Sequence, residues 1–342
     1  MFDYSRFDFL KEVFRWDEEK IKEELSPSFF NYYRRYFNDV LRFKGMIDEA
    51  DHIIKVTNAA GKKVLDLGCG YGLLLIQMGL LGCKEAVGVD SNEKKISIFK
   101  KLLNLLSKED SNLCKTYPCI GDILKIDYPD NYFDVVIARE TISHVRDVDT
   151  FFIEVKRVLK KDGIFFIKDG NNALDIYTRF SRRRLWKKHE FGPVAGTGLS
   201  KPYRVTRKEM IMERYPDLDS NKLDYLVDKT IGMWGEELYR AVEDFLNKGI
   251  LTKTPKFKYR NPKTGDYAEV EFNPYYLKNV LNKLGFKAYI IAPFYSYTYS
   301  GLKGTFLNAI SKTISLFHPL SLLVAPTFEI VANKINTNRL PI

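Results

Sequence analysis

The chain has 342 residues, in which 54 Lys and Arg outnumber 44 Asp and Glu to give a formal net charge of +10. The hydrophobic share of 45% and the charged share of 29% are ordinary for a globular protein and argue against long disordered stretches. The length exceeds that of one compact α/β domain, so we expect a core domain with added segments. The basic balance favours anionic partners without identifying one.

Signals for export and for metal binding are absent from the sequence pattern. Residues 1–20 lack the basic start and apolar core of a signal peptide, and no apolar run reaches transmembrane length. No two cysteines form a CxxC pair, which disfavours a zinc or redox site; the cysteines are Cys69, Cys83, Cys114 and Cys119. We therefore expect a cytoplasmic protein with reduced thiols and no bound metal.

The first half of the chain changes pattern near residue 61. Apolar residues recur at helical spacing over 1–60, which predicts a helical N-terminal cap. Over 61–170 short strands alternate with helices, which predicts a parallel sheet with helices on both faces. The expected strands are 64–67, 85–89, 116–120, 133–138 and 163–167, and the expected helices are 73–81, 91–106 capped by Ser91, and 150–159.

Residues 171–260 interrupt this alternation. They contain a basic run, a Gly/Pro-rich loop and a capping-box spacing between Thr206 and Glu209. We expect a mostly helical insertion that covers the substrate.

The alternation resumes over 261–342, with a helix expected at 274–285 and strands at 287–292 and 328–332. Between these strands lies an apolar segment, 301–325, with helical spacing. We expect it to pack on the sheet; the other interpretations are a lid over a hydrophobic acceptor and a contact with a membrane surface.

The residues Val64 to Gly72 read VLDLGCGYG and predict a strand, a glycine-rich turn and the start of a helix. Such a turn lets the backbone approach a nucleotide, and Asp90, at the end of the second strand, can accept hydrogen bonds from ribose hydroxyls. Leu73 stands where the NAD fingerprint has its third glycine, and no P-loop Lys follows. Asp66 suits a cationic ligand and not a pyrophosphate. Together these features favour S-adenosylmethionine (SAM) over a turn that only permits helix packing.

The segment from Val64 to Asp169 resembles the class I SAM-dependent methyltransferases, in particular the small-molecule group related to ubiquinone-biosynthesis methyltransferases. VLDLGCGYG resembles their first motif, VGVD their second-strand acid, and FDVVIARETISHVRDVDTFFIEVKRVLKKDGIFFI their later motifs. NPYYLKNVLNKLGFKAYIIAPF and FEIVANK look like their last helix and strands. The resemblance implies a Rossmann-like α/β fold with a seven-stranded, mostly parallel sheet and an antiparallel last strand. It also implies SAM as cofactor and S-adenosylhomocysteine as product.

The resemblance further implies which residues contact the cofactor. In the family an Asp in the position of Asp122 meets the adenine amino group, and the next backbone N–H, that of Ile123, meets the ring. The expected cofactor-binding residues are Asp66, Gly68, Cys69, Gly70, Gly72, Asp90, Ser91, Asp122, Ile123 and Arg139.

Methyl transfer from SAM is an in-line displacement, so a protein contributes alignment, desolvation and, for a hydroxyl acceptor, a general base. The loop 138–144, expected to face the methyl group, lacks the Asn/Asp-Pro-Pro-aromatic signature and the Pro-Cys pair of DNA methyltransferases. His144 is one candidate base, with a structural role at a helix start as its other interpretation. His189 with Glu190, in the insertion, is a rival base pair or an exposed loop pair.

A basic run at 179–188 includes Arg182, Arg183 and Lys187, which we expect either to bind an anionic acceptor or to form a solvated helix face. The leading hypothesis is methyl transfer to oxygen of a small molecule or of a sugar in a glycan. A second is RNA methylation, motivated by net charge, although no RNA-binding module is appended and nucleic acid is disfavoured as a partner. A third is a SAM-binding scaffold or sensor without transfer. The acceptor and the oligomeric state are not encoded in these motifs.

Overall fold

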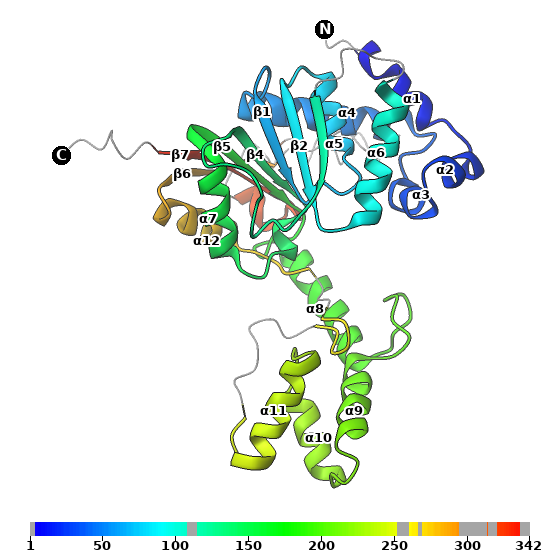
Figure 1. Cartoon of the computed structure of the whole chain (residues 1–342), viewed down its shortest axis with the longest axis vertical. Helices are drawn as coiled ribbons and strands as arrows, with labels where there is room; N and C mark the ends of the chain where they lie inside the picture. Colours follow the sequence, from blue (N-terminus) through cyan, green and yellow to red (C-terminus); the bar gives the residue numbers. More distant parts are fainter. Residues whose placement is uncertain are drawn as a thin grey trace, which may run out of the picture. The chain divides into compact units, whose positions relative to one another are not determined.

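The computed structural model describes residues 4–107, 115–251, 260–265, 269–293, 313 and 320–335. It divides into two compact units, and each is described by itself. Unit 1 comprises Met1–Asp175 and Phe272–Ile342 and contains a sheet with helices around it (Figure 1). Unit 2 comprises Ile176–Glu271 and is helical (Figure 1). The sequence-based division at residues 60, 170 and 260 stays a prediction, because compact units need not coincide with domains.

The sheet of unit 1 has seven strands in the order β3-β2-β1-β4-β5-β7-β6. The strands are β1 (Lys63–Leu67), β2 (Glu85–Asp90), β3 (Lys115–Ile120), β4 (Phe133–Arg139), β5 (Leu159–Asp169), β6 (Phe286–Ile291) and β7 (Phe328–Lys334). The pairs among β1 to β5 are parallel, and β7 runs antiparallel to both β5 and β6. This confirms the predicted Rossmann-like sheet with its antiparallel last strand.

The helices of unit 1 cover both faces of this sheet (Figure 1). They are η1 (Ser5–Phe7), α1 (Asp8–Val13), α2 (Glu18–Glu24), α3 (Pro27–Tyr33), α4 (Val40–Thr57), α5 (Leu73–Leu80), α6 (Glu93–Ser107), η2 (Ile142–His144), α7 (Val148–Val158), α12 (Pro274–Lys283) and η3 (Leu320–Leu323). Helices α4, α5 and α6 share one hydrophobic cluster with Val135 and Ile137 of β4. Phe151 and Phe152 of α7 pack on Phe165 of β5, on the opposite face.

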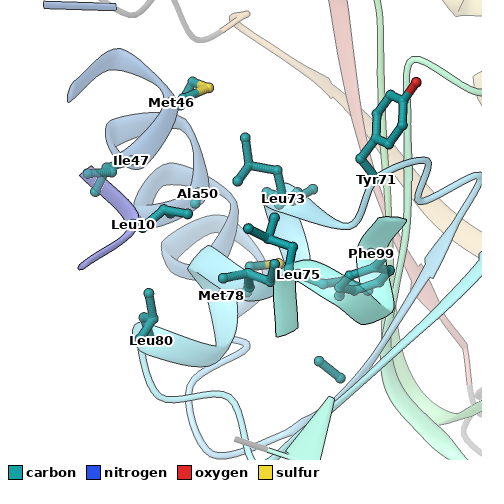
Figure 2. Close-up of a cluster of buried hydrophobic side chains, with 14 of the residues drawn as sticks. Leu10, Met46, Ile47, Ala50, Tyr71, Leu73, Leu75, Met78, Leu80 and Phe99 are labelled. Atoms are coloured by element: carbon teal, nitrogen blue, oxygen red, sulfur yellow. The ribbon is translucent and has the colours of Figure 1, made fainter. Parts of the chain in front are cut away.

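The N-terminal helices pack into the hydrophobic core of unit 1, and their role as a cap stays a prediction. Met46, Ile47 and Ala50 of α4 and Leu75 and Met78 of α5 are buried in one cluster (Figure 2). Burial of a large aliphatic side chain contributes about 1.5–3 kcal/mol, so the packing of these side chains holds α4 against α5. The glycine turn that precedes α5 is therefore held from both sides, by β1 and by the packing of α4 on α5.

Two predicted helix caps are wrong. Helix α6 is capped by Asn92, whose Oδ1 accepts the Lys95 N–H at 3.1 Å, and not by Ser91. The backbone N–H of Asn92 is itself held by Asp90, which places the Asn side chain over the first turn. Thr206 lies inside α9, where its hydroxyl donates to the backbone carbonyl four residues earlier, so it caps nothing.

Unit 2 contains α8 (Ile176–Phe191), α9 (Tyr203–Arg214), α10 (Ser220–Lys229) and α11 (Gly235–Lys248). Its helices enclose a small hydrophobic core that includes Ile211, Leu226, Val227, Leu238 and Val242. The unit thus has a core of its own.

The predicted apolar segment 301–325 falls outside the described residues except for residue 313 and residues 320–325. Within the described parts of the chain, no helix combines the length and the hydrophobicity needed to cross a membrane. The same residues contain no cluster of His, Cys, Asp and Glu that could hold a metal ion.

Candidate active site

The glycine turn after β1 has a backbone conformation that glycine adopts without strain. Gly68, Gly70 and Gly72 have φ of 76°, 57° and 72°. A Cβ on Gly68 would lie 2.5 Å from Thr141 Oγ1, and one on Gly72 would lie 2.2 Å from the ring of Phe99. Apart from Gly70 itself and its two neighbours in the chain, no described residue has an atom within 4 Å of the position that a Cβ on Gly70 would take. Two glycines permit close packing, and the third borders open space that a ligand can enter.

Asp66 is a buried carboxylate in β1, two residues before the turn. The residue is 3% exposed, and its Oδ1 has no hydrogen-bond partner among the described residues. Burial raises the pKa of Asp66 to about 7, while Arg139 opposes this shift and Asp90 adds to it. A buried carboxylate without a partner is unfavourable, and a cationic ligand beside it would stabilise the ionised form.

Asp90 ends β2 and holds the turn in place. Its Oδ2 accepts the Gly70 N–H at 2.9 Å, and its Oδ1 accepts the Asn92 N–H at 2.8 Å. Each oxygen keeps a further lone pair, so the carboxylate can also accept hydrogen bonds from ligand hydroxyls. Ser91 is exposed beside it.

Asp122 and Cys69 lie near the same edge of the sheet. Asp122 follows β3; its side chain is exposed, and its Oδ1 accepts the Leu124 N–H at 2.8 Å, while Ile123 is half-buried. Cys69 is half-buried, and a Cβ on Gly88 would lie 2.8 Å from its Sγ. Burial raises the pKa of the Cys69 thiol, which keeps it neutral near pH 7.

Arg139, at the end of β4, is held by a carboxylate of the N-terminal helix α4. Its Nε and Nη2 donate to Glu49 Oε1 and Oε2 at 3.3 and 3.2 Å. Lys168 Nζ lies 2.8 Å from Glu49 and 3.2 Å from the buried Glu329. Burial opposes ionisation of Glu49, but the two cations outweigh it and lower the pKa of Glu49 to about 2. The guanidinium that we expect near the cofactor is therefore fixed by α4.

Glu140 follows Arg139 in a left-handed backbone conformation, with φ of 52°. The other described non-glycine residues with positive φ are Asn or Asp, which adopt it more readily: Asn38, Asn58, Asn131 and Asp162. Glu140 Oε2 accepts the Gly170 N–H at 3.1 Å. This bond joins the loop after β4 to the end of β5, and strain of this kind is typical of functional sites.

The surroundings of Glu140 favour its protonated form. Reduced hydration raises the pKa of Glu140 to about 7, the carboxylate of Asp169 adds to the shift, and Arg139 opposes it. Asp169 is buried and accepts the backbone N–H groups of Ser143 and Asn171, each at 3.0 Å. Glu140 as a whole residue nevertheless keeps surface that is exposed to solvent. A carboxyl group with a pKa near 7 can take a proton from a ligand at neutral pH.

His144 lies in the short helix η2 and is exposed. Its backbone N–H donates to the carbonyl of Thr141 at 2.9 Å. Thr141 Oγ1 in turn donates to the carbonyl of Leu67 at 2.9 Å, which ties the loop after β4 to the end of β1. The role of His144 as a base stays a prediction.

The other predicted catalytic residues lie in unit 2. Glu190 is fully buried and forms an ion pair with Arg207, whose Nε also donates to the Val227 carbonyl at 2.8 Å. Glu190 thus has a structural partner within unit 2. Burial lowers the pKa of His189, which lies with its ring centroid 5.6 Å from that of Tyr203. The role of the two residues as a base pair stays a prediction.

The predicted acceptor-binding cations are on α8. Arg182 forms an ion pair with Glu269, whereas Arg183 and Lys187 are exposed. Their contact with an acceptor also stays a prediction.

Sequence reasoning did not single out Glu140, Asp169 or Glu49. A left-handed backbone at Glu140 leaves no mark in the sequence. Asp169 could have been found, since an acid at the carboxyl end of a parallel strand is a common position for ligand contacts. Glu49 could not, because the helical pattern of α4 does not say which of its polar residues faces β4.

Comparison with known proteins agrees with this geometry. Residues 58–229, half of the chain, match the family model described as a methyltransferase domain. The chain belongs to the class I SAM-dependent methyltransferase family.

Curated relatives of this methyltransferase include the ubiquinone biosynthesis O-methyltransferase of Pelagibacter ubique, 36% identical over 34% of this chain and 45% of the relative. Phosphoethanolamine N-methyltransferase 1 of Arabidopsis thaliana is 28% identical over 66% of this chain and 49% of the relative. The chain thus spans about half the length of the curated relatives it matches. A solved SAM-dependent methyltransferase from Methanosarcina mazei is 13% identical, with coverage of 83% and 97% of the two chains and a TM-score of 0.44.

SAM is the cofactor of this methyltransferase, and the residues of the turn fit it. The unpaired carboxylate oxygen of Asp66 suits the cationic amino group of SAM, and Asp90 has lone pairs free for the ribose hydroxyls. The open space at Gly70 lets the ligand approach the backbone. The assignment of individual contacts, including Asp122 to adenine, stays a prediction.

Proposed function

We propose that this protein transfers the methyl group of SAM to a hydroxyl oxygen of a small molecule or of a sugar, free or in a glycan. The observation that supports oxygen is Glu140, an exposed residue at the carboxyl end of β4 whose carboxyl group has a pKa of about 7. A hydroxyl acceptor needs a base close to neutral pH. The names of the relatives include oxygen, nitrogen and carbon acceptors and so leave the acceptor atom open.

SAM supplies a methyl group made electrophilic by the sulfonium sulfur. In our proposal Asp66 and Asp90 hold the donor, and the Arg139–Glu49 ion pair keeps the end of β4 in place beside it. Glu140 takes the hydroxyl proton as the oxygen–carbon bond forms and the carbon–sulfur bond breaks. The sulfonium charge disappears in the same step, which leaves S-adenosylhomocysteine, a methyl ether and a protonated Glu140. Asp169 raises the basicity of Glu140 through charge repulsion.

One broader feature accompanies this proposal. Cys69 and Cys119 carry free thiols, which supports a reducing compartment and hence a cytoplasmic location.

The test is transfer of labelled methyl groups from SAM into a cell extract, followed by separation of small molecules, glycans and RNA. We expect label in small molecules or glycans as an alkali-stable methyl ether. Label in RNA alone, or SAM binding without any transfer, would contradict the proposal.

The role of Glu140 is tested once an acceptor is known. E140Q should lower kcat about 10²–10⁴-fold, leave SAM affinity unchanged, and abolish the rise of rate with pH near 7. E213Q, which removes the charge of an exposed Glu on α9, is the matched control and should behave as the wild type. A wild-type pH profile in E140Q would exclude Glu140 as the base and leave His144 and His189 as the candidates.

A further inference from the structure

Helix α8 presents large apolar side chains to solvent on one face. The exposed fractions are 80% for Tyr177, 77% for Phe180, 61% for Ile176 and 58% for Phe191. With about 100° of rotation per residue, these four side chains fall within a sector of about 100°. Single exposed apolar residues are common, but four on one helical face mark an interaction surface. We call these residues, together with the three cations described next, the α8 face.

Three exposed cations lie among these apolar side chains. Arg183, Arg184 and Lys187 widen the sector to only about 120° and complete the α8 face. Within the described residues none of them forms an ion pair. Glu271 interacts electrostatically with Arg183 but lies outside the helix, so the α8 face itself contains no acid.

The opposite side of α8 turns inward. Thr178 is buried there, and Leu185, Trp186 and His189 are half-buried. The buried Glu190 lies at the edge of the α8 face, next to Arg183 on the helical wheel. The outer side of α8 therefore carries apolar and basic side chains together. Packing within unit 2 does not explain why the outer side of α8 carries large apolar side chains.

We propose that the α8 face docks on an anionic lipid bilayer surface. A helix that lies in the plane of a membrane inserts aromatic and aliphatic side chains at the headgroup boundary, while Arg and Lys on it contact lipid phosphates. The α8 face offers both groups on one helix of 16 residues. Aromatic side chains such as Tyr177 and Phe180 are also suited to the interface between water and hydrocarbon.

A nucleic acid would be a different occupant and fits less well. Its phosphates would pair with the cations, and its bases could stack on Tyr177 or Phe180. It would leave the aliphatic side chain of Ile176 in water. Within a bilayer surface all four apolar side chains leave water together, which is the stronger driving force.

The experiment is co-sedimentation of the full-length protein with vesicles of phosphatidylcholine alone and of phosphatidylcholine with phosphatidylglycerol. The wild type should bind the anionic vesicles and release at high salt, because each cation near an anionic surface raises partitioning about fivefold. R183Q/R184Q should bind about 25-fold more weakly. K100Q/K101Q, which removes two adjacent exposed cations from α6, is the matched control and should bind as the wild type.

A second variant tests insertion of the rings. Y177S/F180S keeps all charges, and the high exposure of both rings means that it should fold normally, as checked by its melting curve and SAM affinity. It should bind anionic vesicles at least about tenfold more weakly. The proposal is overturned if the two vesicle types bind equally, if the α6 control loses as much as R183Q/R184Q, or if Y177S/F180S binds as the wild type. It is also overturned if R183Q/R184Q weakens binding of a single-stranded RNA oligonucleotide while no vesicle binds.

Discussion

Replacing Asp66 with Asn tests whether this buried acid is kept for ligand binding at the expense of stability. The amide has nearly the shape of the carboxylate but cannot ionise. Asp66 is 3% exposed and has an unpaired oxygen, so the change removes a charge that the fold alone does not stabilise.

The magnitude follows from the pKa of Asp66, which is raised from 3.8 to about 7. Because the folded-state value is the higher one, the stability that the protonated acid provides is complete below pH 3.8 and is lost as pH rises through about 7. Three pKa units correspond to about 4 kcal/mol in the protein without ligand. Burial of the amide costs about 1–3 kcal/mol at every pH. The stability of D66N relative to the wild type should therefore increase by about 3 kcal/mol between about pH 5 and about pH 8.

Urea unfolding across this pH range measures the effect, and calorimetric titration measures SAM affinity at pH 8. D66N should bind SAM about 10–150-fold more weakly, because a charge-assisted hydrogen bond is lost. The variant D149N, at an exposed position of α7, is the control for loss of one acid. The reasoning fails if D66N is destabilised equally at both ends of the pH range, or if it binds SAM as the wild type does.

Three further predictions concern packing and charge. G70A should cost about 1–2 kcal/mol of stability because of the positive φ at residue 70, and it should weaken SAM binding at least about tenfold, whereas G72A should destabilise the protein more because its Cβ would clash with Phe99. Melting curves with and without SAM distinguish the two variants, and equal effects of both would contradict the prediction. E49Q should lower the free energy of unfolding by about 3 kcal/mol near pH 7, and because the pKa of Glu49 is lowered to about 2, this loss should vanish as the pH falls toward 2. Urea unfolding measures the loss, and a loss that does not depend on pH would refute the prediction. R207M should destabilise unit 2 by about 3–5 kcal/mol, and R207M/E190L should recover most of it; hydrogen exchange within unit 2 measures both, and no recovery would exclude a simple buried ion pair.

The strands of the sheet and the helices that flank it could be predicted because the pattern of apolar residues decides them. A strand such as β1 is buried on both faces, so it appears in the sequence as a short apolar run, and α5 follows it as a longer one. The antiparallel direction of the last strand could be predicted from the resemblance alone. Helix starts were less predictable, because Ser91 and Asn92 are both good caps and the choice depends on Asp90, which holds the Asn92 N–H.

The identity of the cofactor could be predicted for a similar reason. The turn needs glycines for its backbone, and strand ends bring acids such as Asp66 and Asp90 to one edge. The acceptor side depends on contacts between distant segments. Glu49 pairs with Arg139, which is 90 residues away in the sequence. The helical pattern of apolar residues does not predict which helix supplies the carboxylate that pairs with a given cation.

Asp66 and Glu140 show how exceptions to local rules coincide with the candidate site. Prediction from sequence relies on local rules: buried charges are paired, and left-handed backbone is left to Gly, Asn and Asp. Asp66 breaks the first rule and Glu140 the second, at the ends of neighbouring strands β1 and β4. Folding stability alone would favour an apolar residue and a glycine there. Our proposal accounts for both exceptions, with a cationic ligand beside the first carboxylate and an acceptor that gives its proton to the second.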